Sequence, residues 1–170
     1  MKIYRGRIIT VDVEEVTLPN GSQMRAEIVR HPGGAAIIAL DAQRHVCLLR
    51  HYRPVANSWL WELPAGKIDH NEAALRTAQR ELREEAGLTA ARWESLGAVL
   101  SSPGVFSEII HLYLARGLMQ GTQRPDEDEV FELHWLPFED AVECAASGEF
   151  NDAKTIIGLM RAAAWLRKHG

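Results

Sequence analysis

Three glutamates, Glu81, Glu84 and Glu85, lie close together near the middle of the 170-residue chain. On a helix, spacings of three and four residues bring such side chains onto one side, where like charges repel by roughly a few tenths of a kcal/mol per pair. A bound cation would remove that repulsion, and ligands that are all oxygen favour Mg²⁺ or Mn²⁺. The spacing therefore indicates a divalent-metal site built on carboxylates.

The element that must carry these carboxylates is a helix from about Glu72 to Ala86. Polar side chains at 69–71 can cap its start, and Gly87 is typical of a helix end. At about 100° per residue, the three glutamates border the apolar stripe of the helix. The i, i+4 pair Arg80–Glu84 can balance an acid that holds no metal. A solvated, salt-bridged helix is the alternative interpretation.

The stretch GKIDHNEAALRTAQRELREEAGL resembles the Nudix box at every defining position. Those positions are Gly66, Glu72, Arg80, Glu81, Leu82, Glu84, Glu85, Gly87 and Leu88. The resemblance implies a Nudix hydrolase, which cleaves a nucleoside diphosphate linked to another group X with the help of divalent metal. It implies that Glu81 and Glu85 are the principal metal ligands and that Glu84 belongs to the candidate catalytic carboxylates. It does not imply the identity of X.

Length and composition limit the remaining possibilities. A chain of 170 residues, 46% apolar and 25% charged, predicts one globular unit with a full core. The net charge of −4 and the lack of a basic run argue against nucleic acid or a membrane as partner. No window approaches eighteen apolar residues, and charges interrupt the N-terminus, so we expect a cytoplasmic protein. Cys47 and Cys144 lack metal-site spacing and are expected to be reduced packing residues.

The N-terminal segment, residues 1–30, alternates polar and apolar residues on both sides of the turn sequence LPNG. This pattern predicts a β-hairpin. A hairpin of this size buries little surface alone, so we expect an extension of the Nudix domain at 31–170. In the ADP-ribose pyrophosphatases, which the chain resembles, such an extension crosses to a partner subunit. The resemblance therefore implies a homodimer with shared substrate pockets.

The stretch HYRPVANSWLWELPAG, just before the box, contains candidate substrate-binding residues. Arg53 could hold a phosphate in a bidentate fork, and Tyr52 precedes it; a surface charge and packing aromatics are the alternatives. The stretch looks like the arginine-bearing strand and WELPAG turn of ADP-ribose pyrophosphatases. In that subgroup the residue before the box glycine lends its carbonyl to a metal, which implies Ala65 here.

Two loops after the box complete the candidate site. Pro103 lies fifteen residues past Leu88, which resembles a sub-signature of ADP-ribose pyrophosphatases, although Pro-Gly also marks ordinary turns. Ser102 and Glu108 of this loop are candidate pocket residues. The resemblance also places a general base on the acidic loop before the last strand, at Glu129 with Glu127 as the second choice. A merely solvated acidic loop is the alternative.

The fold class expected is α/β (α+β), and the resemblance, covering roughly residues 3–165, implies the Nudix α/β/α sandwich with a mixed sheet. Periodicity predicts strands at 35–40, 46–53, 93–100, 109–115 and 130–137, and helices at 138–148 and 152–167. The leading hypothesis is hydrolysis of ADP-ribose, or a close ADP-sugar, to AMP and a sugar phosphate. GDP-mannose, NADH or an oxidised nucleotide remain alternative substrates. A catalytically silent nucleotide sensor is a further alternative, against which the intact set of acids argues.

Overall fold

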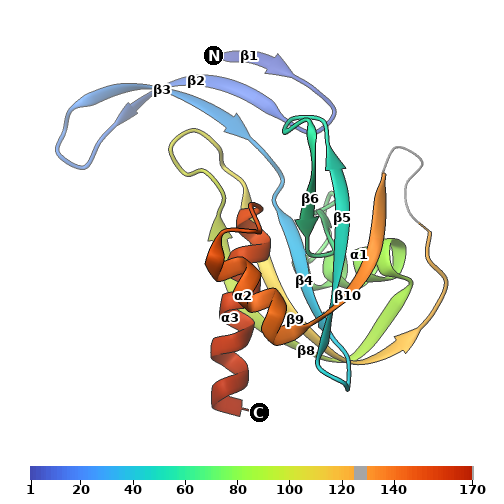
Figure 1. Cartoon of the computed structure of the whole chain (residues 1–170). Coiled ribbons are helices and arrows are strands. Elements are labelled where there is room, and N and C mark those ends of the chain that lie inside the picture. Colours follow the sequence, from blue (N-terminus) through green and yellow to red (C-terminus); the bar gives the residue numbers. More distant parts are fainter. Residues whose placement is uncertain (125–129, 170) are drawn as a thin grey trace.

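The computed structural model describes residues 1–124 and 130–169. Its main body is a seven-stranded mixed sheet of order β10-β5-β4-β9-β8, in which β6 pairs with β5 and β7 pairs with β4 (Figure 1). The strands are β4 (Gly34–Leu40), β5 (His45–Arg53), β6 (Ser58–Glu62), β7 (Ala65–Lys67), β8 (Leu88–Leu100), β9 (Ile109–Gln120) and β10 (Phe131–Pro137). Strands β4 and β9 run parallel, whereas the other neighbouring pairs are antiparallel.

Strand β4 lies at the centre of the sheet because its sequence, GAAIIAL, is apolar throughout. All seven residues are buried, as expected for a strand that is covered on both faces. Successive side chains of a strand point to opposite faces. Accordingly, Ala36 and Ile38 belong to one apolar cluster, and Ala35 and Ile37 belong to the other. The molecule thus has two cores, one on each side of the sheet.

Three helices cover these two faces. Helix α1 (Ala74–Ala86) packs on one face, while α2 (Phe138–Ser147) and α3 (Ala153–His169) pack together on the other (Figure 1). This arrangement confirms the α/β/α sandwich with a mixed sheet that the sequence predicts. Among the helices of the described residues, none combines the length and the apolar character needed to cross a membrane.

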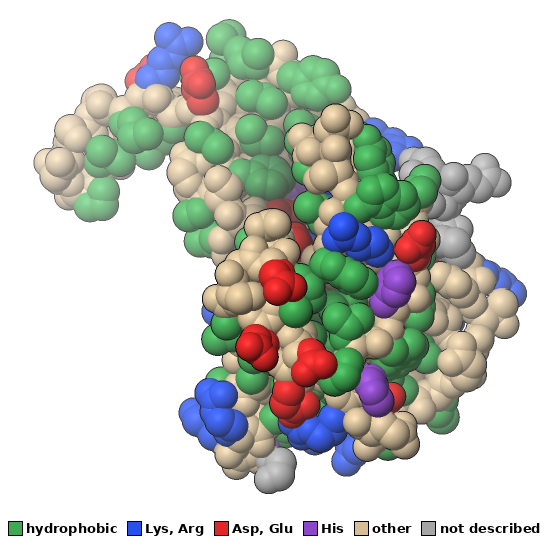
Figure 2. All heavy atoms as spheres, in the orientation of Figure 1, with side chains coloured by type: hydrophobic (Ala, Val, Ile, Leu, Met, Phe, Trp, Pro, Cys, Tyr) green, Lys and Arg blue, Asp and Glu red, His purple; other side chains and the backbone are tan. Residues whose placement is uncertain are grey.

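The N-terminal segment forms a separate sheet of three strands, β1 (Lys2–Arg5), β2 (Thr10–Thr17) and β3 (Gln23–Arg30). Strands β2 and β3 are the expected hairpin, paired from Thr10↔Arg30 to Thr17↔Gln23. The additional strand β1 arises because the chain turns at Gly6, whose N–H donates to the Ile9 carbonyl, and folds back on β2. This sheet extends away from the main body and carries hydrophobic side chains on its surface (Figures 1 and 2).

Element boundaries differ from the sequence prediction at several places. Helix α1 begins at Ala74 rather than at about 72, and its N-cap residue, Ala73, has no polar side chain that could cap it. Strand β8 begins directly after Gly87 rather than at 93, because it pairs with β9 from Leu88 onward. Strand β9 likewise continues to Gln120 rather than ending at 115, because Gln120 pairs with Leu88. Local periodicity does not register pairing with a distant strand.

Candidate active site

The carboxylates of α1 lie where this helix approaches β7. Glu85 is only 1% exposed, and its Oε2 accepts the backbone N–H of Ala65 at 2.8 Å. Glu81 is also largely buried, and a methyl group at Gly66 would overlap its carboxylate. The missing side chain at Gly66 therefore leaves the space that Glu81 occupies, which explains why a glycine is needed before this helix.

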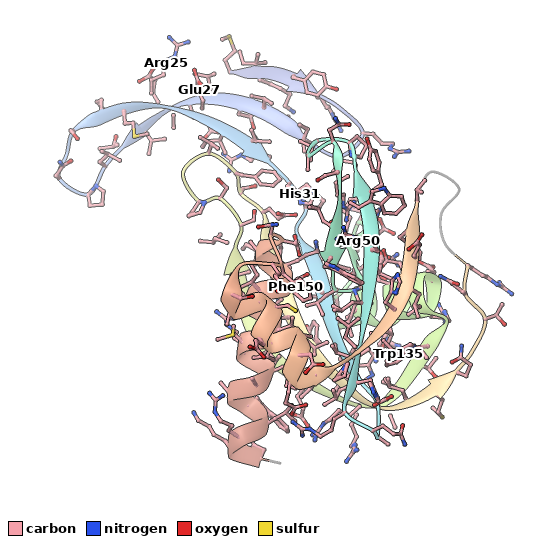
Figure 3. All side chains as sticks on the ribbon, in the orientation of Figure 1. Arg25, Glu27, His31, Arg50, Trp135 and Phe150 are labelled. Atoms are coloured by element: carbon pink, nitrogen blue, oxygen red, sulfur yellow. The ribbon has the colours of Figure 1, made fainter. Side chains whose placement is uncertain are left out.

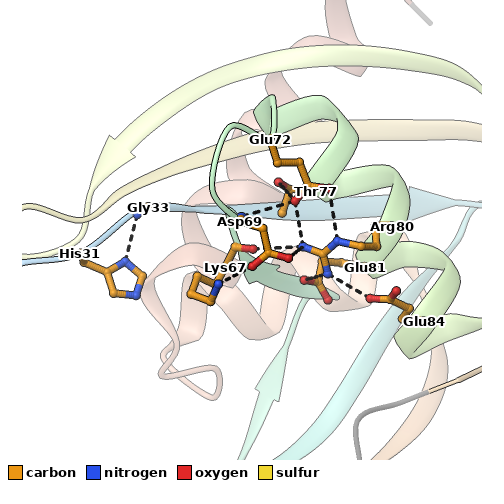
Figure 4. A network of polar contacts seen from close by, with 9 residues as sticks. All are labelled: His31, Gly33, Lys67, Asp69, Glu72, Thr77, Arg80, Glu81 and Glu84. Atoms are coloured by element: carbon orange, nitrogen blue, oxygen red, sulfur yellow. Dashed lines mark hydrogen bonds and ion pairs between the residues drawn. The ribbon is translucent and has the colours of Figure 1, made fainter. Parts of the chain in front are cut away.

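Arg80 holds the acidic side of α1 together (Figure 4). Its guanidinium donates to Glu72 at 3.0 and 3.2 Å, to Glu81 at 2.6 Å and to Glu84 at 3.0 Å, and also to the Lys67 carbonyl at 3.1 Å. The hydrogen bond from Arg80 lowers the pKa of Glu72 to about 2. The predicted Arg80–Glu84 pair is thus present, within a larger network that holds these carboxylates close together.

A second charged network forms the opposite wall. Glu62 is 2% exposed and accepts two hydrogen bonds from Arg53, at 2.7 and 2.8 Å, and one from Lys154 at 2.7 Å. Lys154 also donates to Asp152 at 3.0 Å, and Asp152 accepts the N–H of Thr155 in the first turn of α3. Burial alone would raise the pKa of Glu62, but its two cationic partners lower it to about 2. Four charges of balanced sign therefore fix the start of α3 to β5 and β6.

Between these walls lies a cleft with two lobes of about 410 and 400 Å³. Both lobes are lined by Ile8, His31, Arg53, Gly66 and Lys67, which makes them one continuous space. His31 lies where β3 leads into β4 (Figure 3). One lobe, called the carboxylate lobe here, continues to Arg80 and Glu81. The other, called the distal lobe, continues to Glu108, Asp152 and Lys154.

Five of the ten site residues singled out in the sequence border this cleft. Ala65 and Glu108 line the distal lobe, Tyr52 and Glu81 line the carboxylate lobe, and Arg53 lines both. The fork of Arg53, however, is occupied by Glu62 in this structure rather than facing the cleft unpaired.

Glu84, Ser102 and the two candidate bases are placed differently. Glu84 lines a separate polar hollow with Arg83, Thr122 and Arg124. The neighbour of Ser102, Ser101, lines the cleft, whereas the Ser102 carbonyl accepts the N–H groups of Val105 and Phe106 and shapes the loop. Glu127 and Glu129 lie outside the described residues.

The donor set around Gly66 suits a hard divalent cation. Glu81 and Glu85 provide carboxylate oxygens, and the backbone at Ala65 lies against Glu85, which are the oxygen donors that such a cation prefers. Within residues 1–124 and 130–169, no three acidic, cysteine or histidine side chains already converge on one point. The residues therefore match the chemistry of a cation such as magnesium, with the Arg80 guanidinium at present bonded to Glu81.

Several cleft residues had no recognised signal in the sequence. His31 is in the segment HPGG, whose glycines and proline predict only a break between two strands. Lys154 is at the start of the last helix, whose amphipathic pattern predicts only packing against the core. His51, 3% exposed, also lines the carboxylate lobe, and its Nδ1 is buried without a hydrogen-bond partner. These residues become recognisable only when strand pairing brings them to one place.

Comparison with known proteins agrees with this fold. The family model of the NUDIX domain matches residues 30–157, and the chain therefore belongs to the Nudix family. It is 38% identical over 160 residues to an ADP-ribose pyrophosphatase of Bacillus subtilis, covering 93% of this chain and 86% of the relative. It matches a methanol dehydrogenase activator of Bacillus methanolicus with the same identity and coverage.

A solved structure of an ADP compounds hydrolase superposes on the whole chain. The TM-score is 0.84 at 25% identity, with 100% of this chain and 92% of the other covered. The likeness therefore includes the N-terminal sheet as well as the sandwich.

Proposed function

We propose that this Nudix hydrolase cleaves the diphosphate of ADP-ribose, or of a closely related ADP-sugar, to AMP and a sugar phosphate, which for ADP-ribose is ribose 5-phosphate. The observation that carries the proposal is the cleft between α1 and the start of α3. It combines the Glu81 carboxylate at one end with cationic side chains at its middle, as hydrolysis of a small dianion requires. Relatives named for ADP-ribose and ADP compounds support the choice of substrate.

Glu81, Glu85 and the carbonyl of Ala65 would hold the divalent cation, with Mg²⁺ or Mn²⁺ as the candidates. When bound, the cation supplies Lewis-acid polarisation of the phosphate and lowers the pKa of a bound water. Arg80 orients Glu81 through its 2.6 Å hydrogen bond. Lys67, at the junction of the two lobes, adds positive charge where the diphosphate would lie.

Arg53 and Tyr52 would contact the substrate from β5. Nε and Nη2 of Arg53 are held by Glu62, and in the described part of the chain Nη1 has no recorded hydrogen bond. Because Lys154 also neutralises Glu62, Arg53 can turn part of its guanidinium toward a phosphate without leaving a buried carboxylate unpaired. Glu108 provides an acceptor for sugar hydroxyl groups in the distal lobe.

Glu129 is proposed as the general base, and Glu127 as the second choice. Both precede Val130, whose carbonyl accepts the N–H of Tyr52 at 3.0 Å, so the chain that follows them is fixed beside a cleft residue. Loss of a general base costs about 10² to 10⁴ in kcat. Steady-state rates of Glu129→Gln and Glu127→Gln distinguish the two candidates, and full kcat in both variants would remove this loop from the mechanism.

The experiment that tests the proposed function is a substrate panel. The protein is assayed with Mg²⁺ or Mn²⁺ against ADP-ribose, GDP-mannose, NADH and an oxidised nucleoside triphosphate. We expect the highest kcat/KM for ADP-ribose or another ADP-sugar. A higher value for GDP-mannose or NADH would move the assignment to another Nudix substrate, and no hydrolysis of any compound would leave a nucleotide-binding role.

A second candidate function is activation of a dehydrogenase, because the relative named methanol dehydrogenase activator matches the chain as well as the pyrophosphatase does. Adding the protein to a methanol dehydrogenase assay tests it. Activation by the wild type and by a hydrolysis-deficient Glu85→Gln variant alike would establish a role independent of hydrolysis. Activation by the wild type alone would make it a consequence of hydrolysis.

A homodimer built through the N-terminal sheet is also proposed. Met1, Ile3 and Tyr4 of this segment are more than half exposed, and Met24 is 46% exposed. An apolar groove of about 870 Å³ lies between β2, β3 and the loop at 101–107. An exposed apolar surface of this kind is typical of an interface, and a second copy of the chain is the partner that the resemblance to ADP-ribose pyrophosphatases implies. The cytoplasmic location stays a prediction.

A further inference from the structure

His31 occupies the junction of the two cleft lobes, and its ring has one defined hydrogen bond. The Nδ1 atom accepts the backbone N–H of Gly33 at 3.1 Å (Figure 4). The ring also contacts Phe106 of the loop after β8, with centroids 5.2 Å apart. Its side chain is 12% exposed. The imidazole is therefore fixed in position from two sides while it remains open to the cleft.

The bond from Gly33 decides which ring nitrogen carries the proton. An N–H donor needs the lone pair of Nδ1, so the neutral imidazole must carry its proton on Nε2. Glu108 Oε1 lies 3.4 Å from the same Nδ1 and would need a proton there instead. Burial, the largest influence, lowers the pKa of His31 below its ordinary value; Glu108 opposes this effect, and Lys67 adds to it. The neutral form bonded to Gly33 is therefore the one present at neutral pH.

The second nitrogen, Nε2, faces accessible space. Within the described residues, the buried side-chain nitrogens and oxygens that lack a hydrogen-bond partner are His51 Nδ1 and Arg116 Nε. No hydrogen bond is recorded for His31 Nε2, so this atom is accessible rather than buried. Both lobes of the cleft border His31. The ring thus presents one N–H donor to the point where the lobes meet.

The neighbours of His31 indicate which ligand atom this donor meets. Lys67, Arg53 and Gly66 border the same junction, whereas the carboxylates of Glu108 and Asp152 line the distal lobe alone. Lys67 is paired with Asp69 and Arg53 with Glu62, but an ammonium has three N–H donors and a guanidinium five, so both can also donate to an anionic group at the junction. The acidic lobe favours hydroxyl groups. A phosphate oxygen is the acceptor that fits a neutral N–H donor beside two cations.

We propose that His31 is a substrate-binding residue, whose Nε2–H, oriented by Gly33, donates a hydrogen bond to a phosphate oxygen of the nucleoside diphosphate at the junction of the lobes. The inference rests on the proposed function, because it assumes that a diphosphate occupies the cleft. It differs from a purely structural role, in which His31 would serve only to accept the N–H of Gly33.

Two substitutions separate these roles, because each places a polar atom near only one of the two ring-nitrogen positions of His31. In His31→Asn, the amide oxygen can accept the N–H of a residue two positions later, as in an Asx turn, but nothing reaches the position of Nε2. In His31→Gln, the longer side chain places an N–H near Nε2 and gives up the acceptor at Nδ1. The matched control is His45→Asn, because His45 is the first residue of β5 and lines neither lobe of the cleft.

The kinetic test measures kcat and KM for ADP-ribose with Mg²⁺. A hydrogen bond to a charged acceptor predicts a loss of about 10- to 100-fold in kcat/KM for His31→Asn. We expect KM to carry much of that loss, His31→Gln to lose no more than about fivefold, and His45→Asn to match the wild type. Near wild-type activity of His31→Asn together with a larger loss in His31→Gln would overturn the inference and leave the structural role.

A second readout does not depend on hydrolysis. In ¹⁵N-histidine-labelled protein without metal, long-range ¹H–¹⁵N spectra should show His31 protonated at Nε2, assigned by its loss in His31→Asn. Titration with inorganic pyrophosphate should shift the Nε2 resonance of His31 and not that of His45. A proton on Nδ1, or no shift at saturation, would overturn the inference. Failure of the wild type to hydrolyse any substrate, with the shift retained, would instead reject the proposed function alone.

Discussion

Glu81 and Glu85 are the residues on which the proposed chemistry depends most. Exchanging either for glutamine removes a charge while preserving the shape of the side chain, and a glutamine oxygen at position 85 can still accept the Ala65 N–H. We expect turnover of ADP-ribose to fall at least ~10²-fold in each variant, because a metal ligand is lost. Steady-state kinetics measures this, with circular dichroism to show that the fold is intact.

Glu94→Gln is the control for this pair. Glu94 lies on β8 and is partly exposed, and its ionic partner Arg116 is 3.7 Å away. The same chemical change there should leave turnover unchanged. Wild-type rates in both Glu81→Gln and Glu85→Gln would exclude the proposed metal ligands.

Glu62 makes the stability of the protein depend on pH. Its pKa of about 2 in the folded state lies below the ordinary value of 4.5. A depressed pKa stabilises the fold above pH 4.5, and this contribution, on the order of 2 to 3 kcal/mol, disappears as pH falls toward 2. Urea unfolding of wild type and Glu62→Gln between pH 6 and 3 should give a difference in unfolding free energy that shrinks below pH 4.5. Parallel profiles would show that Glu62 is not held by Arg53 and Lys154.

At the residue scale, the sequence predicted the relations between side chains that lie on one helix. Glu81, Glu84 and Arg80 lie within one turn, so their spacing alone specifies their relation. The partners of Arg53 could not be found this way, because Lys154 is 92 residues from Glu62 and reaches it only after α3 packs beside β6. His31 escaped notice for the same reason, since its function depends on the fold around HPGG.

At the scale of elements, the close approach of β7 to α1 is the feature that positions the acids. A methyl group at Gly66 would overlap the far end of the Glu81 side chain, which can swing away at little cost to the fold. We therefore expect Gly66→Ala to retain its melting temperature within a few degrees but to lose about tenfold or more in kcat, because a displaced ligand costs activity.

Gly104→Ala is the matched control, since nothing lies within 4 Å of an added methyl group there. It should behave as the wild type in both measurements. If Gly66→Ala kept full kcat, the position of Glu81 beside β7 would be unimportant for turnover.

The elements themselves were predicted to different degrees. The buried strand β4 and the charged helix α1 follow from local patterns, an apolar run and a period of 3.6. The early start of β8 and the short strands β6 and β7 follow from pairing with distant strands, which a local pattern does not contain. For the N-terminal segment, the sequence predicted a hairpin. The structure adds a third strand, β1, because the chain turns back at Gly6.

At the scale of the whole molecule, the N-terminal sheet leaves apolar side chains uncovered. If a second copy covers them, the full chain should have twice its mass of 19.0 kDa in light scattering at assay concentration. Removing residues 1–30 should then give a monomer with reduced activity, because the cleft also loses Ile8, which lines both lobes. A full-length protein that is monomeric and active would contradict the proposed dimer.

Hydrolysis of an ADP-sugar diphosphate in this cleft is tested by product analysis in ¹⁸O-labelled water. The protein is incubated with Mg²⁺ and ADP-ribose, and the products are identified by mass. We expect equal amounts of AMP and ribose 5-phosphate, with one ¹⁸O atom in one of the two products. With Glu85→Gln we expect almost no product. Intact ADP-ribose, or cleavage that releases adenine or ADP, would contradict it.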